Sequence, residues 1–183
     1  MTMHRFDDIH THTEGRHEAV LSVAPELVED LLLRDQEQCF SLELHPWHLK
    51  SEEDIRRFEQ RARQLAGHPQ LVAIGECGLD PLCPTPLPLQ HQAFVSALRI
   101  ARELGLPVVI HCVKLWDEMM RDVAQLYSAD ERRKAPIIIH GFRKGPQLAR
   151  QLLDAGFSIS LGTLYNEKTR EVIPADRLYR ETD

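Results

Sequence analysis

The sequence has no long apolar segment, no excess of basic residues and no N-terminal targeting segment, and each absence excludes a class of protein. No stretch approaches the roughly 20 apolar residues that cross a bilayer, and residues 1–6 have no apolar signal-peptide core. The net charge of −6 argues against strong, non-specific binding to DNA. We therefore expect a cytoplasmic protein with no membrane segment, and a chain of 183 residues suits a single domain spanning residues 1–183.

Short apolar runs alternate with amphipathic segments along the whole chain. The runs predict strands at 6–9, 18–23, 39–43, 71–75, 107–110, 136–139, 157–161 and 177–180. The amphipathic segments predict helices at 25–34, 52–66, 87–104, 115–127 and 145–155, with Ser51 suited to cap a helix start and Gly105 to follow a helix end. This alternation predicts an α/β fold, a (β/α)₈ TIM barrel, and the alternative is an open doubly wound sheet.

Metal-binding side chain types stand at the ends of five of the predicted strands. They are His10 and His12, Glu76, His111, His140 and Asp183. The carboxyl ends of distant strands cannot meet at one point in an open sheet, whereas a closed barrel brings them to a common mouth. The pattern therefore favours the barrel and indicates one metal site at its rim.

Each of these residues also has a simpler interpretation when it is taken alone. His10 and His12 project on the same side of an extended chain, but H-x-H is a weak motif. Glu76 could pair with a basic residue at the rim, and His111 or His140 could be a core histidine with a hydrogen-bond partner. Asp8 strengthens the metal interpretation, because a carboxylate can accept the second N–H of a ligand histidine.

The four cysteines show no C-x-x-C pair and no regular spacing, so neither a disulfide framework nor a zinc ribbon is indicated. Cys77 and Cys112 directly follow Glu76 and His111. Neighbours on a strand point to opposite faces, so both thiols should face the outer helices, away from the metal. We expect buried, reduced cysteines.

Other polar and aromatic residues near the predicted mouth are candidates for substrate contacts. His45 and His48 follow a strand and could line the mouth, and Lys114 and Arg143 could hold a phosphate. Trp47 and Trp116 could stack on a base, although packing inside the protein is the expected role of both. The chain ends at Asp183, where a barrel normally continues into a final helix. We therefore expect a barrel without that helix, with a lost C-terminal piece or another subunit as the alternative explanations.

With these residues in place, the chain resembles the TatD-type metal-dependent deoxyribonucleases, which belong to the amidohydrolase-like barrel hydrolases. The resemblance covers nearly the whole chain and rests on motifs at 8–12, 45–46, 74–80, 109–111, 139–142, 156–162 and 173–183. It implies that His10, His12 and Asp183 hold one ion, that His111 and His140 hold the other, and that Glu76 bridges them.

Three departures from the family pattern bear on substrate preference. The segment between His12 and His45 is short, as in a compact branch of the family. Glu43 stands where a glycine is typical, and Val113 replaces a common arginine.

These observations predict a hydrolase that uses two divalent ions, Mg²⁺, Mn²⁺ or Zn²⁺, to activate water for the cleavage of phosphodiester bonds in DNA. Asp183 would act as the general base and Glu76 as the shared carboxylate. Two alternatives stay open: an amidohydrolase or lactonase acting on a small molecule, and a metal-binding protein without turnover. The native ion, the polarity of attack on DNA and the oligomeric state do not follow from the sequence.

Overall fold

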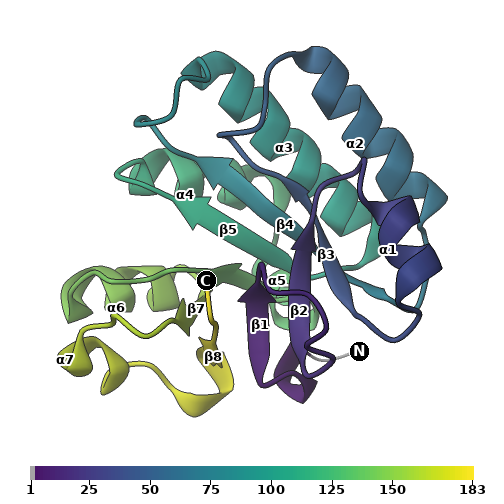
Figure 1. Ribbon diagram of the computed structural model, residues 1–183. Coiled ribbons are helices and arrows are strands. Elements are labelled where there is room, and N and C mark those ends of the chain that lie inside the picture. The colour runs from purple at the N-terminus through teal and green to yellow at the C-terminus, as the bar shows by residue number, and fades with distance from the viewer. Residues whose placement is uncertain (1–2) are drawn as a thin grey trace.

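The computed structural model describes residues 3–183, and all eight strands form one parallel sheet in chain order (Figure 1). The strands are β1 (Asp8–Thr11), β2 (Ala19–Val23), β3 (Phe40–Leu44), β4 (Leu71–Leu79), β5 (Val108–Cys112), β6 (Ile137–Ile139), β7 (Ser158–Leu161) and β8 (Leu178–Arg180). Each of the eight predicted strands is present. The main difference is in β4, which continues through Glu76 to Leu79 instead of ending before it.

The first and last strands approach each other and nearly close the sheet into a barrel. Thr11 and Thr182 form an isolated parallel bridge. The Thr182 N–H donates to the His10 carbonyl over 3.3 Å and to Asp8 Oδ1 over 3.2 Å. In Figure 1 the C-terminus accordingly lies beside β1. An open doubly wound sheet has no contact between its first and last strands in this order, so the predicted (β/α)₈ barrel class is confirmed.

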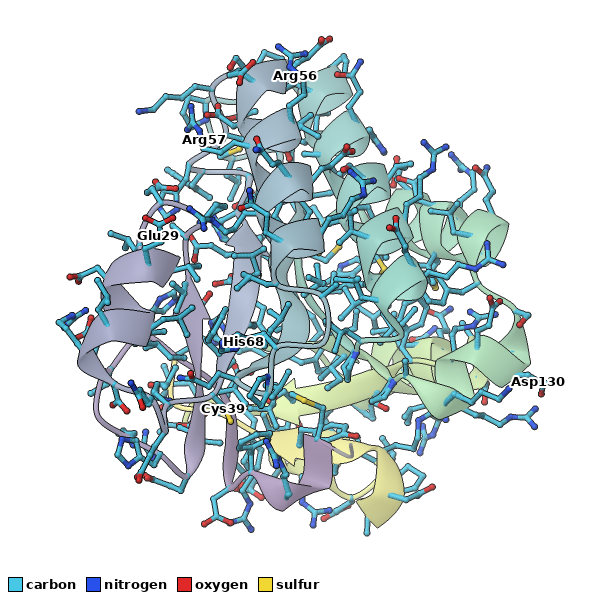
Figure 2. All side chains as sticks on the ribbon, turned by 90° about the vertical axis from the view of Figure 1, so that its right-hand side faces the viewer. Glu29, Cys39, Arg56, Arg57, His68 and Asp130 are labelled. Carbon is cyan, nitrogen blue, oxygen red and sulfur yellow. The ribbon has the colours of Figure 1, made fainter. Side chains whose placement is uncertain are left out.

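The helices cover the outer face of the sheet. They are α1 (Val28–Arg34), α2 (Glu52–Gln64), α3 (Leu87–Leu104), α4 (Trp116–Leu126), α5 (Ala129–Lys134), α6 (Pro146–Asp154) and α7 (Glu167–Arg170), with short 3₁₀ turns at Met3–Arg5 and Ala175–Arg177. The five predicted helices are present, and the side chain of Ser51 accepts from Glu53 N at the start of α2. Charged side chains on α1 and α2, such as Glu29, Arg56 and Arg57, point to solvent (Figure 2).

The alternation of side chains along the strands divides the apolar residues between two clusters. The larger one lies between the sheet and the helices. The smaller one fills the barrel interior and includes Ile9, Val20, Val72, Val109, Ile138 and Tyr179. Because these interior residues seal the barrel, the polar residues at the carboxyl ends of the strands lie above a packed floor. None of the described helices is long and apolar enough to cross a membrane.

The cysteines lie where the strand alternation predicts. All four are free, and Cys77 and Cys112 belong to the cluster between the sheet and the helices. Burial raises the pKa of the Cys112 thiol to about 12 and raises the pKa of Cys77 above its usual range. Cys39, just before β3, is half-buried (Figure 2).

This distribution predicts the reactivity of the thiols. At pH 8, a disulfide reagent such as dithionitrobenzoate should modify Cys39 first and the other three thiols only after unfolding in guanidinium, because the reagent cannot reach a buried thiol. Cys39→Ser is the control and should remove the fast phase. Fast modification of two or more thiols in the native protein would contradict the burial of Cys77 and Cys112.

Candidate metal centre

The carboxyl ends of six strands bring seven polar side chains to one mouth of the barrel. Each side chain lies in the second half of its strand or within three residues after it: His10 and His12 at β1, His45 at β3, Glu76 in β4, His111 in β5, His140 at β6 and Asp183 at β8. The parallel arrangement places these strand ends on the same side. All six residues that the sequence predicts as metal ligands therefore lie at this mouth, together with His45.

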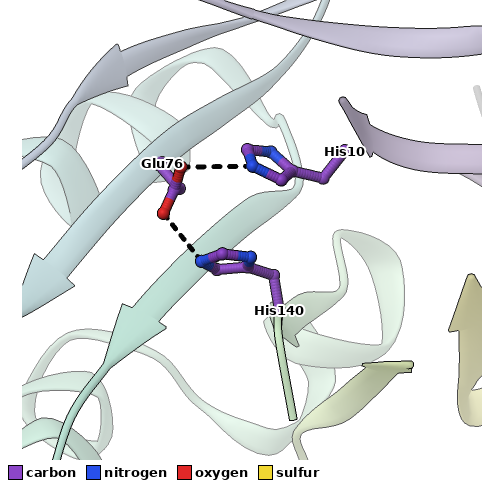
Figure 3. A group of neighbouring side chains, drawn as sticks. All are labelled: His10, Glu76 and His140. Carbon is purple, nitrogen blue, oxygen red and sulfur yellow. Dashed lines mark ion pairs between the residues drawn. The ribbon is translucent and has the colours of Figure 1, made fainter. Parts of the chain in front are cut away.

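Glu76 is the centre of the group, and its carboxylate is almost completely buried. Its Oε1 lies close to three imidazoles: His140 Nε2 at 2.7 Å, His45 Nε2 at 3.1 Å and His111 Nδ1 at 3.2 Å. Its Oε2 faces His10 Nε2 at 3.1 Å and His12 Nε2 at 3.5 Å. Figure 3 shows Glu76 between His10 and His140, with one oxygen directed to each. One carboxylate thus separates two sets of imidazoles.

Asp183 completes the set on the Oε2 side of Glu76. Its Oδ1 lies 3.7 Å from His10 Nε2 and 3.6 Å from His12 Nε2. Three groups of possible ligand atoms result, each within 4.8 Å: His10, Glu76 and His140; His10, His12 and Asp183; and His45, Glu76 and His111. Imidazole nitrogens with carboxylate oxygens are a donor set that suits zinc and other divalent transition metals.

The hydrogen bonding of the buried histidines fits a metal ion. Among the described residues, both ring nitrogens of His10 and the Nδ1 of His140 have no hydrogen-bond partner. His10 Nε2 lies 3.1 Å from Glu76 Oε2 without forming a hydrogen bond. A buried polar atom without a partner is costly. A cation held by His10, Glu76 and their neighbours would satisfy these atoms, so the residues fit the metal that the sequence implies.

The pKa shifts of Glu76 and the histidines show that the cluster stabilises a positive charge, either a proton or a cation, beside the buried carboxylate. Burial alone would raise the pKa of Glu76, but the neighbouring rings of His10, His111, His12 and His140 outweigh this and hold it far below its usual range. Burial lowers the pKa of His140, yet the carboxylates of Glu181 and Glu76 outweigh this and raise it to about 10. The pKa of His10 and that of His12 are also raised. Protons on these rings compensate for the buried carboxylate when no metal ion does so.

Two carboxylates lie beside the histidines, and the sequence reasoning missed both. Asp80 Oδ2 lies 3.2 Å from His111 Nε2, so this nitrogen can donate to the carboxylate and leave Nδ1 free for a metal. Glu181 Oε1 lies 3.8 Å from His140 Nδ1 and accepts from the Gly141 N–H. The spacing could have indicated Glu181, because it stands two residues before Asp183 in an extended segment and projects on the same side.

Asp8 does not have the role that the sequence suggested. Its Oδ1 accepts from the backbone N–H of His10 over 3.1 Å, and its Oδ2 pairs with Arg16 at 2.8 Å and with the Thr182 hydroxyl. Asp8 therefore makes no hydrogen bond to the ring of His10, neither of whose nitrogens has a hydrogen-bond partner. Asp8 instead links β1 to the end of the chain, so the prediction that it fixes a histidine tautomer is wrong.

The backbone of Trp47 determines which nitrogen of His45 carries the proton. Its Nδ1 accepts from the backbone N–H of Trp47 over 3.2 Å. A neutral imidazole has one donor and one acceptor nitrogen. Nε2 therefore carries the proton and faces Glu76 Oε1 as a donor. His45 is placed to donate a hydrogen bond and not to coordinate a cation through Nε2.

The other predicted substrate contacts divide between the inside and the outside of a cavity of about 430 Å³ at the mouth. Its lining includes Arg143, Lys144 and Trp116 beside His12, His45, His111 and Asp183. Lys114 and His48 are outside that lining, and His48 Nδ1 instead lies 3.1 Å from Glu43 Oε1. The packing expected for both tryptophans holds for Trp116, which is partly buried against the core. It is wrong for Trp47, which is 50% exposed.

Comparisons with known proteins agree with this geometry. A family model described as TatD related DNase matches residues 9–183. A Cronobacter sakazakii protein named 3'-5' ssDNA/RNA exonuclease TatD is 37% identical over 161 residues, which are 82% of this chain and 59% of that protein. A Mycobacterium tuberculosis protein named uncharacterized metal-dependent hydrolase TatD is 31% identical over 162 residues, 81% of this chain and 59% of that protein.

The fold has a close match among solved structures. The crystal structure of YJJV, a TatD homolog from Escherichia coli K12, superposes with a TM-score of 0.77 at 23% identity, covering all of this chain and 80% of the other. This chain spans at most about three-fifths of the length of the two named relatives. The family match and the barrel with its histidine and carboxylate cluster lead to one conclusion: the chain belongs to the TatD-related DNase family.

Proposed function

We propose that this chain is a single-domain, divalent-metal-dependent hydrolase that cleaves phosphodiester bonds in DNA, with two ions at the mouth of the barrel. One observation carries the proposal: the buried carboxylate of Glu76 faces imidazoles on both of its oxygens. A histidine cannot join two cations, whereas a carboxylate can. The exonuclease name of the Cronobacter relative supports single-stranded nucleic acid as the substrate class.

Each residue of the cluster has a definite task in this proposal. His10, His12 and Asp183 hold one ion, His111 and His140 hold the other, and Glu76 is shared. When bound, divalent ions lower the pKa of a water molecule and offset the charge that develops on a phosphoryl group. Asp80 keeps the ring of His111 oriented for binding, and the buried carboxylate of Glu181 adds negative charge 3.8 Å from His140 Nδ1.

The remaining residues act on the proton and on the substrate. Asp183 is partly exposed, and His10 holds its pKa below the usual range, so its carboxylate is available to take a proton from water as a general base. His45, whose Nε2 faces Glu76, lines the same cavity, where Arg143 and Lys144 offer cations to the substrate along the wall. Lys114 and His48, just outside, contact the strand farther from the cleaved bond.

Removal of metal tests the proposal. Dialysis against EDTA should lower the hydrolysis of a labelled single-stranded oligonucleotide at least about a hundredfold, because the charge compensation at the phosphate is lost. Addition of Mg²⁺, Mn²⁺ or Zn²⁺ should restore it, and elemental analysis of the same sample gives the number and identity of ions per chain. Gel electrophoresis of single-stranded DNA, RNA and supercoiled plasmid reports the preferred polymer.

Other outcomes would select another function. Turnover of lactones or amides with no cleavage of nucleic acid would indicate an amidohydrolase-type enzyme. Bound metal with no turnover of any substrate would indicate a metal-binding protein. Nuclease activity that EDTA leaves unchanged would contradict the metal mechanism itself.

A further inference from the structure

Trp47 is an exposed aromatic side chain whose position is fixed from two directions. Its indole Nε1–H donates to Asp80 Oδ2 over 2.7 Å, and its backbone N–H donates to His45 Nδ1 over 3.2 Å. The indole is nevertheless 50% exposed. The only polar atom of the ring has its partner, so the exposed part of the side chain is apolar.

The two residues that hydrogen-bond Trp47, Asp80 and His45, both contact the metal cluster. Asp80 Oδ2, which accepts from the indole, also lies 3.2 Å from His111 Nε2. His45, which accepts from the Trp47 backbone, places Nε2 3.1 Å from Glu76 Oε1. A side chain joined to the cluster by two such paths keeps a constant position relative to a phosphate bound there. Such constancy is what a subsite for a substrate needs.

The two loops that carry Trp47 and its surroundings are joined to each other. The buried hydroxyl of Thr85 lies 2.7 Å from the carbonyl of Pro46 and 2.7 Å from that of Leu49. Asp80 Oδ1 accepts from the backbone N–H of Leu82 over 2.8 Å, and the side chain of Leu82 is 61% exposed. Asp80, which contacts His111, therefore accepts from the indole of Trp47 and from the backbone of Leu82, and both residues are exposed outside the lining of the cavity. We call these two side chains the rim patch.

We propose that the rim patch is a stacking platform for an unpaired nucleobase next to the cleaved phosphodiester, with Trp47 as the surface on which the base lies. This inference rests on the proposed nuclease function and deepens it. Every base has a π-face, so an aromatic platform binds single strands with little sequence preference. A paired base is stacked within its duplex and cannot lie on the indole. The platform therefore selects single-stranded substrates.

Basic side chains at the mouth complement the negative charge of the phosphates of such a strand. The cavity that holds the metal cluster has Arg143 and Lys144 on its wall, and the chain as a whole carries a net charge of −6. Attraction for a polyanion is therefore local to the mouth, and affinity for nucleic acid away from it is weak. With little general electrostatic binding, stacking on Trp47 supplies a substantial part of the affinity for substrate.

A double-mutant cycle between protein and substrate tests the platform. One partner is Trp47→Ala, and the other is an oligonucleotide with abasic sugars at the two nucleotides that flank the cleaved bond. Either change alone should raise KM about tenfold, and both together should raise it no further, because stacking on an aromatic ring contributes about 1–3 kcal/mol per base. Trp47→Phe keeps a ring and should stay within about threefold of the wild type. Leu33→Ala, an exposed apolar residue on α1, is the control and should change nothing.

The kinetic constants distinguish a platform from a positioning role. A fall in kcat with constant KM in Trp47→Ala would show that Trp47 acts through Asp80 and His111 and would overturn the proposal. Independent, multiplicative effects of the two changes would overturn it as well. Trp47→Phe covers the case in which the alanine variant does not fold.

Fluorescence separates this inference from the proposed function, because it needs no turnover. The chain has two tryptophans, and Trp116 is partly buried edge-on against Phe142. Oligothymidylate added to the EDTA-treated protein should quench the emission of the wild type much more than that of Trp47→Phe, in which only Trp116 on the cavity wall still emits. Quenching without nuclease activity would overturn the proposed function and keep the platform. Nuclease activity without quenching would keep the function and overturn the platform.

Discussion

Glu76→Gln is expected to lower kcat for metal-dependent hydrolysis by roughly a thousandfold or more, because both ion positions lose their shared anion. An amide has one acceptor oxygen, and its NH₂ group would face either His140 Nε2 or His10 Nε2, which lie 2.7 and 3.1 Å from the two oxygens of Glu76. Elemental analysis should show that the variant holds fewer ions per chain. Steady-state kinetics with a labelled oligonucleotide measures the loss.

A matched control separates this effect from a general loss of negative charge. Glu103 is exposed and pairs with Arg63 at 3.4 Å on the outer helices, so Glu103→Gln should keep the activity. His111→Ala should resemble Glu76→Gln, since it removes the ring that Asp80 orients. Near wild-type turnover in Glu76→Gln, with metal bound, would disprove the role of Glu76 as the shared ligand.

Gly78→Ala is expected to lower the free energy of unfolding by about 3 kcal/mol. Gly78 lies in β4 beside β5, with φ at +150°, and a Cβ at this position would overlap the backbone carbonyl of His111. Backbone atoms cannot rotate away as a side chain can, so the two strands must separate. That shift would also move His111, and metal affinity should fall together with stability. Urea unfolding monitored by circular dichroism measures the first effect.

Gly105→Ala shows how much of the loss of stability in Gly78→Ala comes from the overlap with the backbone of His111. Gly105 ends α3 with φ at +68°, and a Cβ there meets no atom within 4 Å. Its cost is therefore only that of a left-handed backbone, about 1 kcal/mol. Equal losses in the two variants would show that backbone conformation, and not the contact with β5, accounts for the effect of Gly78→Ala.

The regular parts of the barrel are predictable because local and tertiary preferences agree in them. Apolar runs such as 107–110 and 136–139 become strands buried on both faces. The two helices that the sequence did not predict are short. No residue of α5 (Ala129–Lys134) is buried, and only Thr169 is buried in α7 (Glu167–Arg170). Neither presents the apolar stripe on which a prediction from periodicity depends.

The positions of the predicted strand ends were enough to indicate the metal ligands. The residues that contact these ligands could be identified only from the fold. His10, Glu76 and His140 come from β1, β4 and β6, and the common direction of parallel strands together with the closing of the sheet brings them together. The direction of the Asp8 carboxylate was predicted wrongly. It depends on Arg16 and on the return of the chain at Thr182, and neither contact is local in sequence.

The sequence by itself determined the order of strands and helices, the side of the sheet on which the ligands stand and the burial of Cys77 and Cys112. These properties follow from periodicity, which is a local property of the chain. Only the tertiary structure decided that Asp8 pairs with Arg16 and Thr182, that His45 Nδ1 accepts from the Trp47 backbone, and that Trp47 stays exposed. Each of these depends on contacts between residues on different loops and strands, and such contacts exist only after the barrel has formed.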